Sequence, residues 1–166
     1  MKYAVFSILF LSLAIVSHAQ RSLEEMLASH NSQSIPYISV AEARMMQLHH
    51  KAIILDVRKL EEFHVSRIPS AYFFGKGGIL EDELSQLLKD KQQPIIVYCS
   101  VGIRSETAAE KLKKSGFTNV RNLYGGIFEW KNEGYPVYDE NGQPTEKVHT
   151  FSAKWEPYLK KGIKVH

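Results

Sequence analysis

The sequence predicts an α/β domain with a parallel central sheet flanked by helices on both faces. Short apolar runs, rich in isoleucine and valine, alternate with longer amphipathic segments throughout the chain. Strands that alternate with helices favour βαβ units, in which each helix crosses over the sheet to the next parallel strand. The second observation is length, because 166 residues favour one domain of this kind.

The expected elements follow one another from about residue 39. Ser39 and Glu42 form a capping box that opens a helix over 41–50, and "LEEF" at 60–63 could form one helical turn. Apolar or β-branched runs predict three strands over 52–58, 72–75 and 94–98, and a fourth within 117–126. Amphipathic patterns predict further helices over 81–90, 105–116 and 127–134.

Residues 1–19 are predicted to be a signal peptide. Lys2 supplies a short positive region, an apolar stretch follows, and small residues precede the expected cleavage after Ala19. A membrane anchor is the alternative, but the stretch is short for a spanning helix of about 20 residues. We therefore expect an exported protein, periplasmic or secreted, that begins at Gln20 and keeps no stable membrane anchor.

The remaining chain divides into three parts. Residues 20–34 form a polar N-terminal leader with a weak helical pattern, residues 35–138 form the domain, and residues 139–166 form a C-terminal extension. The extension carries Phe151 and Trp155 near helical spacing with later apolar residues, so we expect a helix packed on the domain. A docking surface for a partner is the alternative for these aromatic residues.

Composition excludes several classes of function. A net charge of +3 is too mild to suggest nucleic-acid binding, although it could help to steer a small anion. One cysteine and scattered histidines do not form a zinc site, so no metal and no cofactor is expected. A monomer is the simplest oligomeric state.

The single cysteine, Cys99, stands where a strand meets a helix. In an open α/β sheet, ligands collect at the carboxyl ends of the strands, and a helix N-terminus favours negative charge. Gly102 permits a tight loop whose N–H groups face inward, and Arg104 adds a positive charge nearby. These neighbours should lower the pKa of the thiol and make Cys99 a nucleophile. A buried, inert cysteine is the alternative.

Two blocks of sequence resemble the rhodanese family of sulfurtransferases over residues 35–138. One contains "ILDVR", "EEF" and "IPSA"; the other runs from "PIIVYCSVGIRS" to "NEGYPV". The resemblance implies that Cys99 is the nucleophile, that Asp56 and Arg58 support the site, and that Gly125, Gly126 and Trp130 pack. It also implies a substrate cradle of backbone N–H groups, formed by Ser100, Val101, Gly102, Ile103, Arg104 and Ser105. This chain departs from the family at Ser66, Arg67 and Ser70, where the family often has Gly, His and Gly.

The resemblance also implies a reaction. A small anionic donor such as thiosulfate would give its outer sulfur to Cys99 as a persulfide, and a thiol or cyanide would accept it. Phosphatases with the same topology place five residues between cysteine and arginine, whereas four lie between Cys99 and Arg104. The shorter loop disfavours phosphatase or arsenate reductase activity. A sulfur-binding or redox-sensing module without turnover is the second hypothesis.

Overall fold

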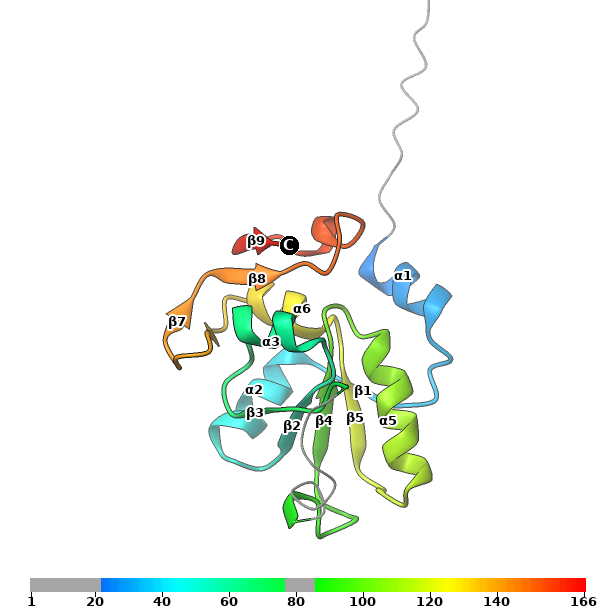
Figure 1. Ribbon diagram of the computed structural model, residues 1–166. Helices are drawn as coiled ribbons and strands as arrows, with labels where there is room; N and C mark the ends of the chain where they lie inside the picture. Colours follow the sequence, from blue (N-terminus) through cyan, green and yellow to red (C-terminus); the bar gives the residue numbers. More distant parts are fainter. Residues whose placement is uncertain (1–21, 77–85) are drawn as a thin grey trace, which may run out of the picture.

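The computed structural model describes residues 22–76 and 86–166, and its centre is a five-stranded sheet (Figure 1). The strand order is β1-β5-β4-β2-β3, and every neighbouring pair is parallel. The strands are β1 Tyr37–Ile38, β2 Ile53–Asp56, β3 Ala71–Phe73, β4 Ile95–Tyr98 and β5 Val120–Leu123. The central strand β4 is buried along its whole length, which explains its uninterrupted apolar sequence.

Helices cover both faces of the sheet, as the sequence predicts. They are α1 Leu23–His30, α2 Val40–Leu48, α3 Leu60–Val65, α5 Arg104–Lys114 and α6 Gly126–Asn132. Successive side chains of β4 point to opposite faces and enter two separate cores. Val97 packs in a core with Ala109 and Leu112 of α5. Ile96 and Tyr98 pack in the other core, to which α1, α2 and α6 contribute.

Most of the expected elements are present within one or two residues of their predicted ends. The four expected strands correspond to β2, β3, β4 and β5, and the helices expected after residues 40, 104 and 126 are α2, α5 and α6. The signal peptide predicted over 1–19, and residues 81–85 of the helix predicted over 81–90, lie outside the described residues. Within the described part of the chain, no helix combines the length and the apolar character needed to span a membrane.

The segment predicted to be a polar leader contains a helix of the domain. Ser22 and Glu25 form a capping box at the start of α1, and Met26 and Leu27 are buried in a core of the domain. Leu23 packs against the same core, and the other residues of α1 are exposed, so the helix buries one apolar side. The domain therefore begins earlier than the predicted boundary at residue 35.

The prediction of a helix in the C-terminal extension is wrong. The extension contains a single 3₁₀ turn over Glu156–Tyr158 and three short strands, which are β7 Pro144–Thr145, β8 Lys147–His149 and β9 Ile163–Val165. Strand β7 pairs with β6, which spans Val137–Tyr138. Pro157 explains the difference, because a helix through this region would lose the N–H of that residue. Strands β8 and β9 pair in parallel.

The extension nevertheless packs on the domain. Val148 and Leu159 are buried in the same core as α6, and the side-chain amide of Asn132 donates to the carbonyl of Tyr158 at 2.9 Å. Lys131 of α6 binds Glu146 at 2.8 Å. Figure 1 shows β8 and β9 lying across the end of the domain that carries α3 and α6. We call residues 147–166 the C-terminal segment.

Candidate active site

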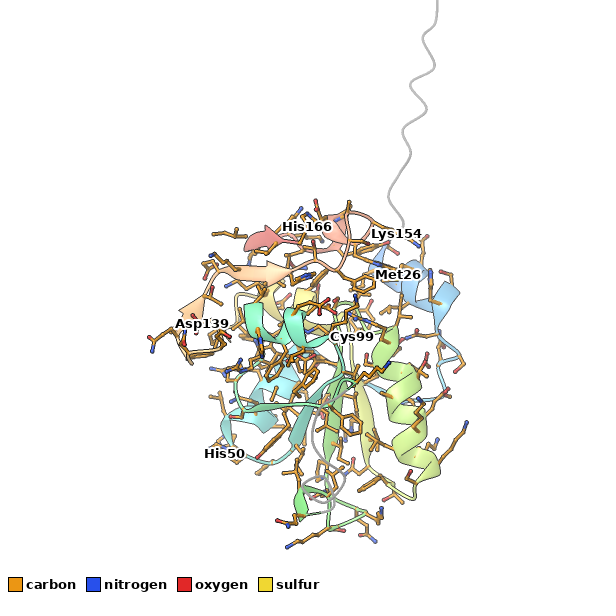
Figure 2. All side chains as sticks on the ribbon, viewed as in Figure 1. Met26, His50, Cys99, Asp139, Lys154 and His166 are labelled. Atoms are coloured by element: carbon orange, nitrogen blue, oxygen red, sulfur yellow. The ribbon has the colours of Figure 1, made fainter. Side chains whose placement is uncertain are left out.

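Cys99 follows the last residue of β4 and lies at the carboxyl end of the sheet. Figure 2 shows it at the end of the sheet that faces the C-terminal segment. Its side chain is almost completely buried, with 1% of the residue exposed. The sulfur Sγ accepts a hydrogen bond from the Gly102 N–H at 3.1 Å and lies 3.5 Å from the Ser105 hydroxyl oxygen. The cysteine is therefore buried among donors, not among apolar groups alone.

Helix α6 fixes the first peptide groups of the loop after Cys99. The N–H groups of Ile127 and Phe128 donate to the carbonyls of Cys99 and Ser100 at 3.0 and 3.1 Å. Each carbonyl points opposite to the N–H in the same planar peptide group, so the N–H groups of Ser100 and Val101 point away from α6. Gly126 allows this contact, because a Cβ there would lie 2.3 Å from the carbonyl oxygen of Cys99.

Gly102 turns the loop toward the sulfur. Its φ of +108° is a conformation that other residues rarely adopt. Its carbonyl accepts hydrogen bonds from the side-chain amides of Asn31 and Asn122, at 2.9 and 2.8 Å. While the Gly102 carbonyl is held by the two asparagines, the N–H of Gly102 donates to Sγ of Cys99. The positive φ of Gly102 is thus the feature of the tight loop that requires glycine at this position.

Ser105 lies in the first turn of α5, close to the sulfur. Its hydroxyl donates to Asn122 Oδ1 at 2.7 Å and is also within reach of Sγ. A hydroxyl has one hydrogen, so it can serve only one of these acceptors at a time. Ser105 can thus respond to added negative charge on the sulfur by turning its hydrogen from Asn122 toward it.

The surroundings favour the thiolate form of Cys99. Burial raises the pKa of the thiol, but the positive charge of Arg104 and the hydrogen bonds from Ser105 and Gly102 lower it by more. The pKa of Cys99 therefore lies below the ordinary value for cysteine. A larger fraction of the reactive thiolate is present at neutral pH than in a free thiol.

A pH titration of the thiol should confirm this direction. The rate of alkylation of Cys99 by iodoacetamide should rise with pH and level off with a midpoint below that of free cysteine, because the thiolate is the reacting form. Arg104→Ala should move the midpoint to higher pH, since it removes the charge that lowers the pKa. Arg121→Ala, which removes an exposed arginine paired with Glu42, should leave it unchanged. A midpoint that Arg104→Ala does not move would contradict the assigned cause.

Arg104 is fixed by a carboxylate that the sequence analysis did not single out. Its guanidinium binds both oxygens of Glu62 at 2.7 and 2.8 Å, and Glu62 is completely buried. Such a bidentate pair holds the planar group in one orientation. The positive charge therefore stands beside Cys99 in a fixed ion pair with Glu62, rather than free to follow a substrate.

Glu62 also holds the cradle to α3. Its carboxylate accepts from the Ser100 hydroxyl at 3.1 Å and from the Lys59 N–H at 3.0 Å, and Arg104 donates to the same hydroxyl at 3.0 Å. Burial raises the pKa of Glu62, but the hydrogen bonds and the charge of Arg104 lower it by more. The pKa of Glu62 is therefore below the ordinary value for a glutamate. The ionised carboxylate thus joins α3, the loop and the start of α5.

Asp56 and Arg58 form a separate buried pair. The Arg58 guanidinium binds Asp56 at 2.6 Å and donates to the carbonyl of Ser66 at 2.6 Å, and both side chains are inaccessible to solvent. Asp56 pairs in register with Tyr98, the residue before Cys99. Neither side chain hydrogen-bonds to Sγ, whose partners are Gly102 and Ser105. The pair therefore links the end of β2 to the loop at Ser66, next to the end of β4.

A small pocket opens at the sulfur. Its volume is about 170 Å³, and it is lined by the cradle loop and by the C-terminal segment. The lining residues are Cys99, Ser100, Val101, Ile103, Arg104, Phe151 and Trp155. Arg104 lies under the Phe151 ring, 4.5 Å from its centre. The extension therefore contributes directly to the surroundings of the cysteine.

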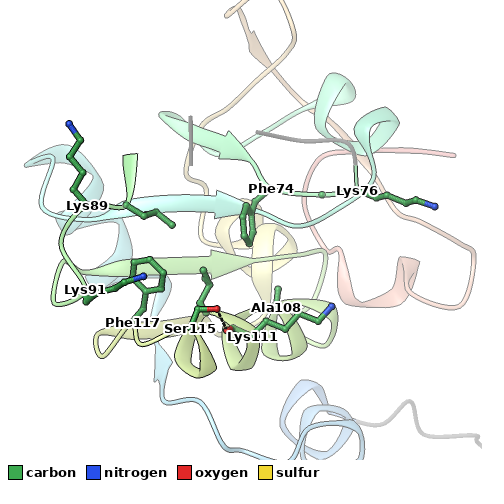
Figure 3. Close-up of a pocket in the computed structure, with 11 residues that line it drawn as sticks. Phe74, Lys76, Lys89, Lys91, Ala108, Lys111, Ser115 and Phe117 are labelled. Atoms are coloured by element: carbon green, nitrogen blue, oxygen red, sulfur yellow. Dashed lines mark hydrogen bonds between the residues drawn. The ribbon is translucent and has the colours of Figure 1, made fainter. Parts of the chain in front are cut away.

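A larger cavity, of about 880 Å³, lies elsewhere (Figure 3). Figure 3 shows Phe74 and Phe117 among the side chains that line it, with Lys91 beside Phe117, and Cys99 is not among its lining residues. Lys76 and Lys89 lie on either side of residues 77–85 in the sequence. The smaller pocket is the candidate active site, because Cys99 is among the residues that line it.

Several residues of the site were not predicted from the sequence. Asn31 lies in the predicted N-terminal leader, and Asn122 follows Arg121 in β5, where the sequence gives no sign that the asparagine is buried. Glu62 is one of two adjacent glutamates, and only Glu62 is buried. The aromatic pattern of the tail drew attention to Phe151 and Trp155, but nothing in it pointed to the site.

Comparison with known proteins identifies the family. A model of the rhodanese-like domain matches residues 39–133, more than half of the chain. The chain belongs to the rhodanese-like domain family. The family predicted from the sequence is thus confirmed, and the match contains the whole Cys99 loop and its supporting helices.

Relatives within the family differ in name and in length. The chain is 33% identical over 104 residues to thiosulfate sulfurtransferase GlpE of Coxiella burnetii, covering 63% of the chain and 94% of GlpE. It is 35% identical over 104 residues to the putative sulfur carrier protein YrkF of Bacillus subtilis, covering 62% of the chain and 55% of YrkF. Other relatives are named tRNA uridine(34) hydroxylase, and the chain spans about a third of their length.

Solved structures agree with the fold class. The crystal structure of a rhodanese-related protein from Thermoplasma volcanium matches with a TM-score of 0.53 and 28% identity, covering 63% of this chain and 99% of that one. The predicted rhodanese-like α/β fold is therefore confirmed. Sulfurtransferases occur in this family beside sulfur carriers and hydroxylases, so the family leaves the particular reaction open.

Proposed function

We propose that this protein is a sulfurtransferase that carries sulfane sulfur as a persulfide on Cys99. The observation that carries the proposal is the position of Sγ, which accepts from the Gly102 N–H and lies beside Ser105 at the start of α5. These donors lower the pKa of the thiol and so favour the thiolate that would attack a sulfur donor. The similarity to GlpE supports the same reaction.

The reaction takes two steps. In the first, the Cys99 thiolate attacks the outer sulfur of thiosulfate, the sulfur–sulfur bond breaks, and sulfite leaves with its electron pair. In the second, cyanide or a thiolate attacks the terminal sulfur of the persulfide, which restores the Cys99 thiolate. The charge is balanced in both steps, so neither an oxidant nor a reductant is needed. The scheme is ping-pong, since sulfite leaves before the acceptor reacts.

Mass spectrometry tests the proposal directly. Thiosulfate treatment should add the mass of one sulfur atom to the peptide that contains Cys99, and cyanide should then remove it with formation of thiocyanate. Protein alkylated before treatment should gain nothing. An unmodified Cys99 peptide after treatment with thiosulfate would contradict the proposed chemistry.

A sulfur carrier is the second candidate. The burial of Cys99 under the C-terminal segment would suit a stored persulfide, and YrkF carries that name. The number of turnovers distinguishes the two functions. Many molecules of thiocyanate formed per protein favour an enzyme, whereas a single sulfur atom per protein, released once, favours a carrier.

A further inference from the structure

The walls of the pocket above Cys99 come from two distant parts of the chain. Val101 and Ile103 belong to the cradle loop, and Phe151 and Trp155 belong to the C-terminal segment. The volume of about 170 Å³ is close to that of cavities that hold a single benzene ring. The pocket can therefore accept an apolar group of that size next to the reacting sulfur.

The charges around the pocket do not favour a small dianion. Among the residues that line the pocket, Arg104 alone is positively charged, and both oxygens of Glu62 bind it. With Cys99 ionised, these three groups carry a net negative charge. Lys59 and Lys154 lie near the Phe151 and Trp155 rings but outside the lining. Thiosulfate carries two negative charges, and the one cation that it meets among the described residues lining the pocket is already paired with Glu62.

Phe151 is held at the pocket by the backbone around it. Its φ of +65° is rare for an aromatic residue, and such strain persists only where neighbouring contacts impose it. The Phe151 N–H donates to His149 Nδ1 at 3.0 Å, and the Thr150 N–H donates to the Val165 carbonyl at 2.8 Å. The ring is 41% exposed, so its own burial does not explain this conformation.

We propose that the C-terminal segment selects the sulfur donor, and that this donor carries an apolar group of about one ring, as an aryl thiosulfonate does. The inference rests on the proposed transfer of sulfur to Cys99. The family match ends at residue 133, so the selecting segment lies outside it. In the reaction, the Cys99 thiolate attacks the outer sulfur of the thiosulfonate. The bond to the sulfonyl sulfur breaks, aryl sulfinate leaves with the electron pair, and Cys99 becomes a persulfide anion.

The test compares kcat/KM for benzenethiosulfonate and for thiosulfate in the full-length protein. The unsubstituted protein should prefer benzenethiosulfonate by about tenfold or more, the range expected for filling an apolar pocket. Phe151→Gly removes the ring at a position whose positive φ suits glycine, and Trp155→Ala removes the second wall. Each should lower the preference severalfold. Tyr72→Ala, which removes an exposed aromatic residue from β3, should leave it unchanged.

A binding experiment separates this inference from the proposed function. Benzenesulfinate should quench tryptophan fluorescence saturably in Cys99→Ser, and Trp155→Ala should abolish the quenching, because the other tryptophan, Trp130, is completely buried. If neither donor places sulfur on Cys99 but the quenching is seen, the proposed function fails and the pocket assignment stands. If sulfur transfer occurs without preference or quenching, the inference about the C-terminal segment is overturned.

Discussion

Replacing Cys99 by serine should reduce sulfur transfer from thiosulfate to cyanide at least about a thousandfold. The serine hydroxyl is not ionised at neutral pH, and it cannot form the persulfide that links the two half-reactions. Gly102 and Ser105 would still face the substituted side chain, but they would have no sulfur anion to stabilise. The measurement is the initial rate of thiocyanate formation at saturating thiosulfate.

The fold should survive this substitution. Serine has almost the same shape as cysteine, and its oxygen can accept the hydrogen bond from the Gly102 N–H. We expect the free energy of unfolding to change by no more than about 1–2 kcal/mol. A variant with an intact circular dichroism spectrum and substantial residual turnover would refute Cys99 as the nucleophile. A variant that fails to fold would show that the thiol is needed for packing.

The sheet could be predicted from the sequence because its strands are chemically distinct from their surroundings. "IIVY" of β4 is buried on both faces, so its side chains are mostly apolar, and the Tyr98 hydroxyl accepts a hydrogen bond from the Ile68 N–H. The position of Cys99 followed from the same reasoning, since the residue after a parallel strand lies at the sheet edge where ligands bind. Local pattern and chain order are sufficient for these two inferences.

The rest of the site depends on contacts between distant residues. Asn31 and Asn122 bind the same carbonyl of Gly102 from widely separated positions in the sequence, and no local pattern relates them. The tail shows the limit of periodicity. Phe151 and Trp155 are spaced as on a helix, yet a proline at 157 and pairing of β8 with β9 give them a different backbone. Their shared position above Cys99 arises from that backbone.

Replacing Glu62 by glutamine should destabilise the protein by about 3 kcal/mol. The substitution leaves Arg104 half-buried without its counter-charge, and removal of one partner of a buried pair typically costs about 3–5 kcal/mol. We expect a cost at the lower end of this range, because 32% of the Arg104 side chain is exposed to solvent. The glutamine amide would also place N–H groups against the donors of Lys59 and Arg104. Denaturant unfolding measures the change.

Glu42→Gln is the matched control for this substitution. Glu42 pairs with Arg121, but both side chains are more than a third exposed, so its loss should cost less than about 1 kcal/mol. The pH dependence provides an independent test. Because the pKa of Glu62 is lower in the folded protein than in the unfolded chain, its ionisation stabilises the fold at neutral pH, and that stability is lost as pH falls into the acid range. Glu62→Gln should remove this part of the acid sensitivity, whereas Glu42→Gln should keep it. Equal losses of stability in the two variants would mean that the buried carboxylate does not hold the cradle together.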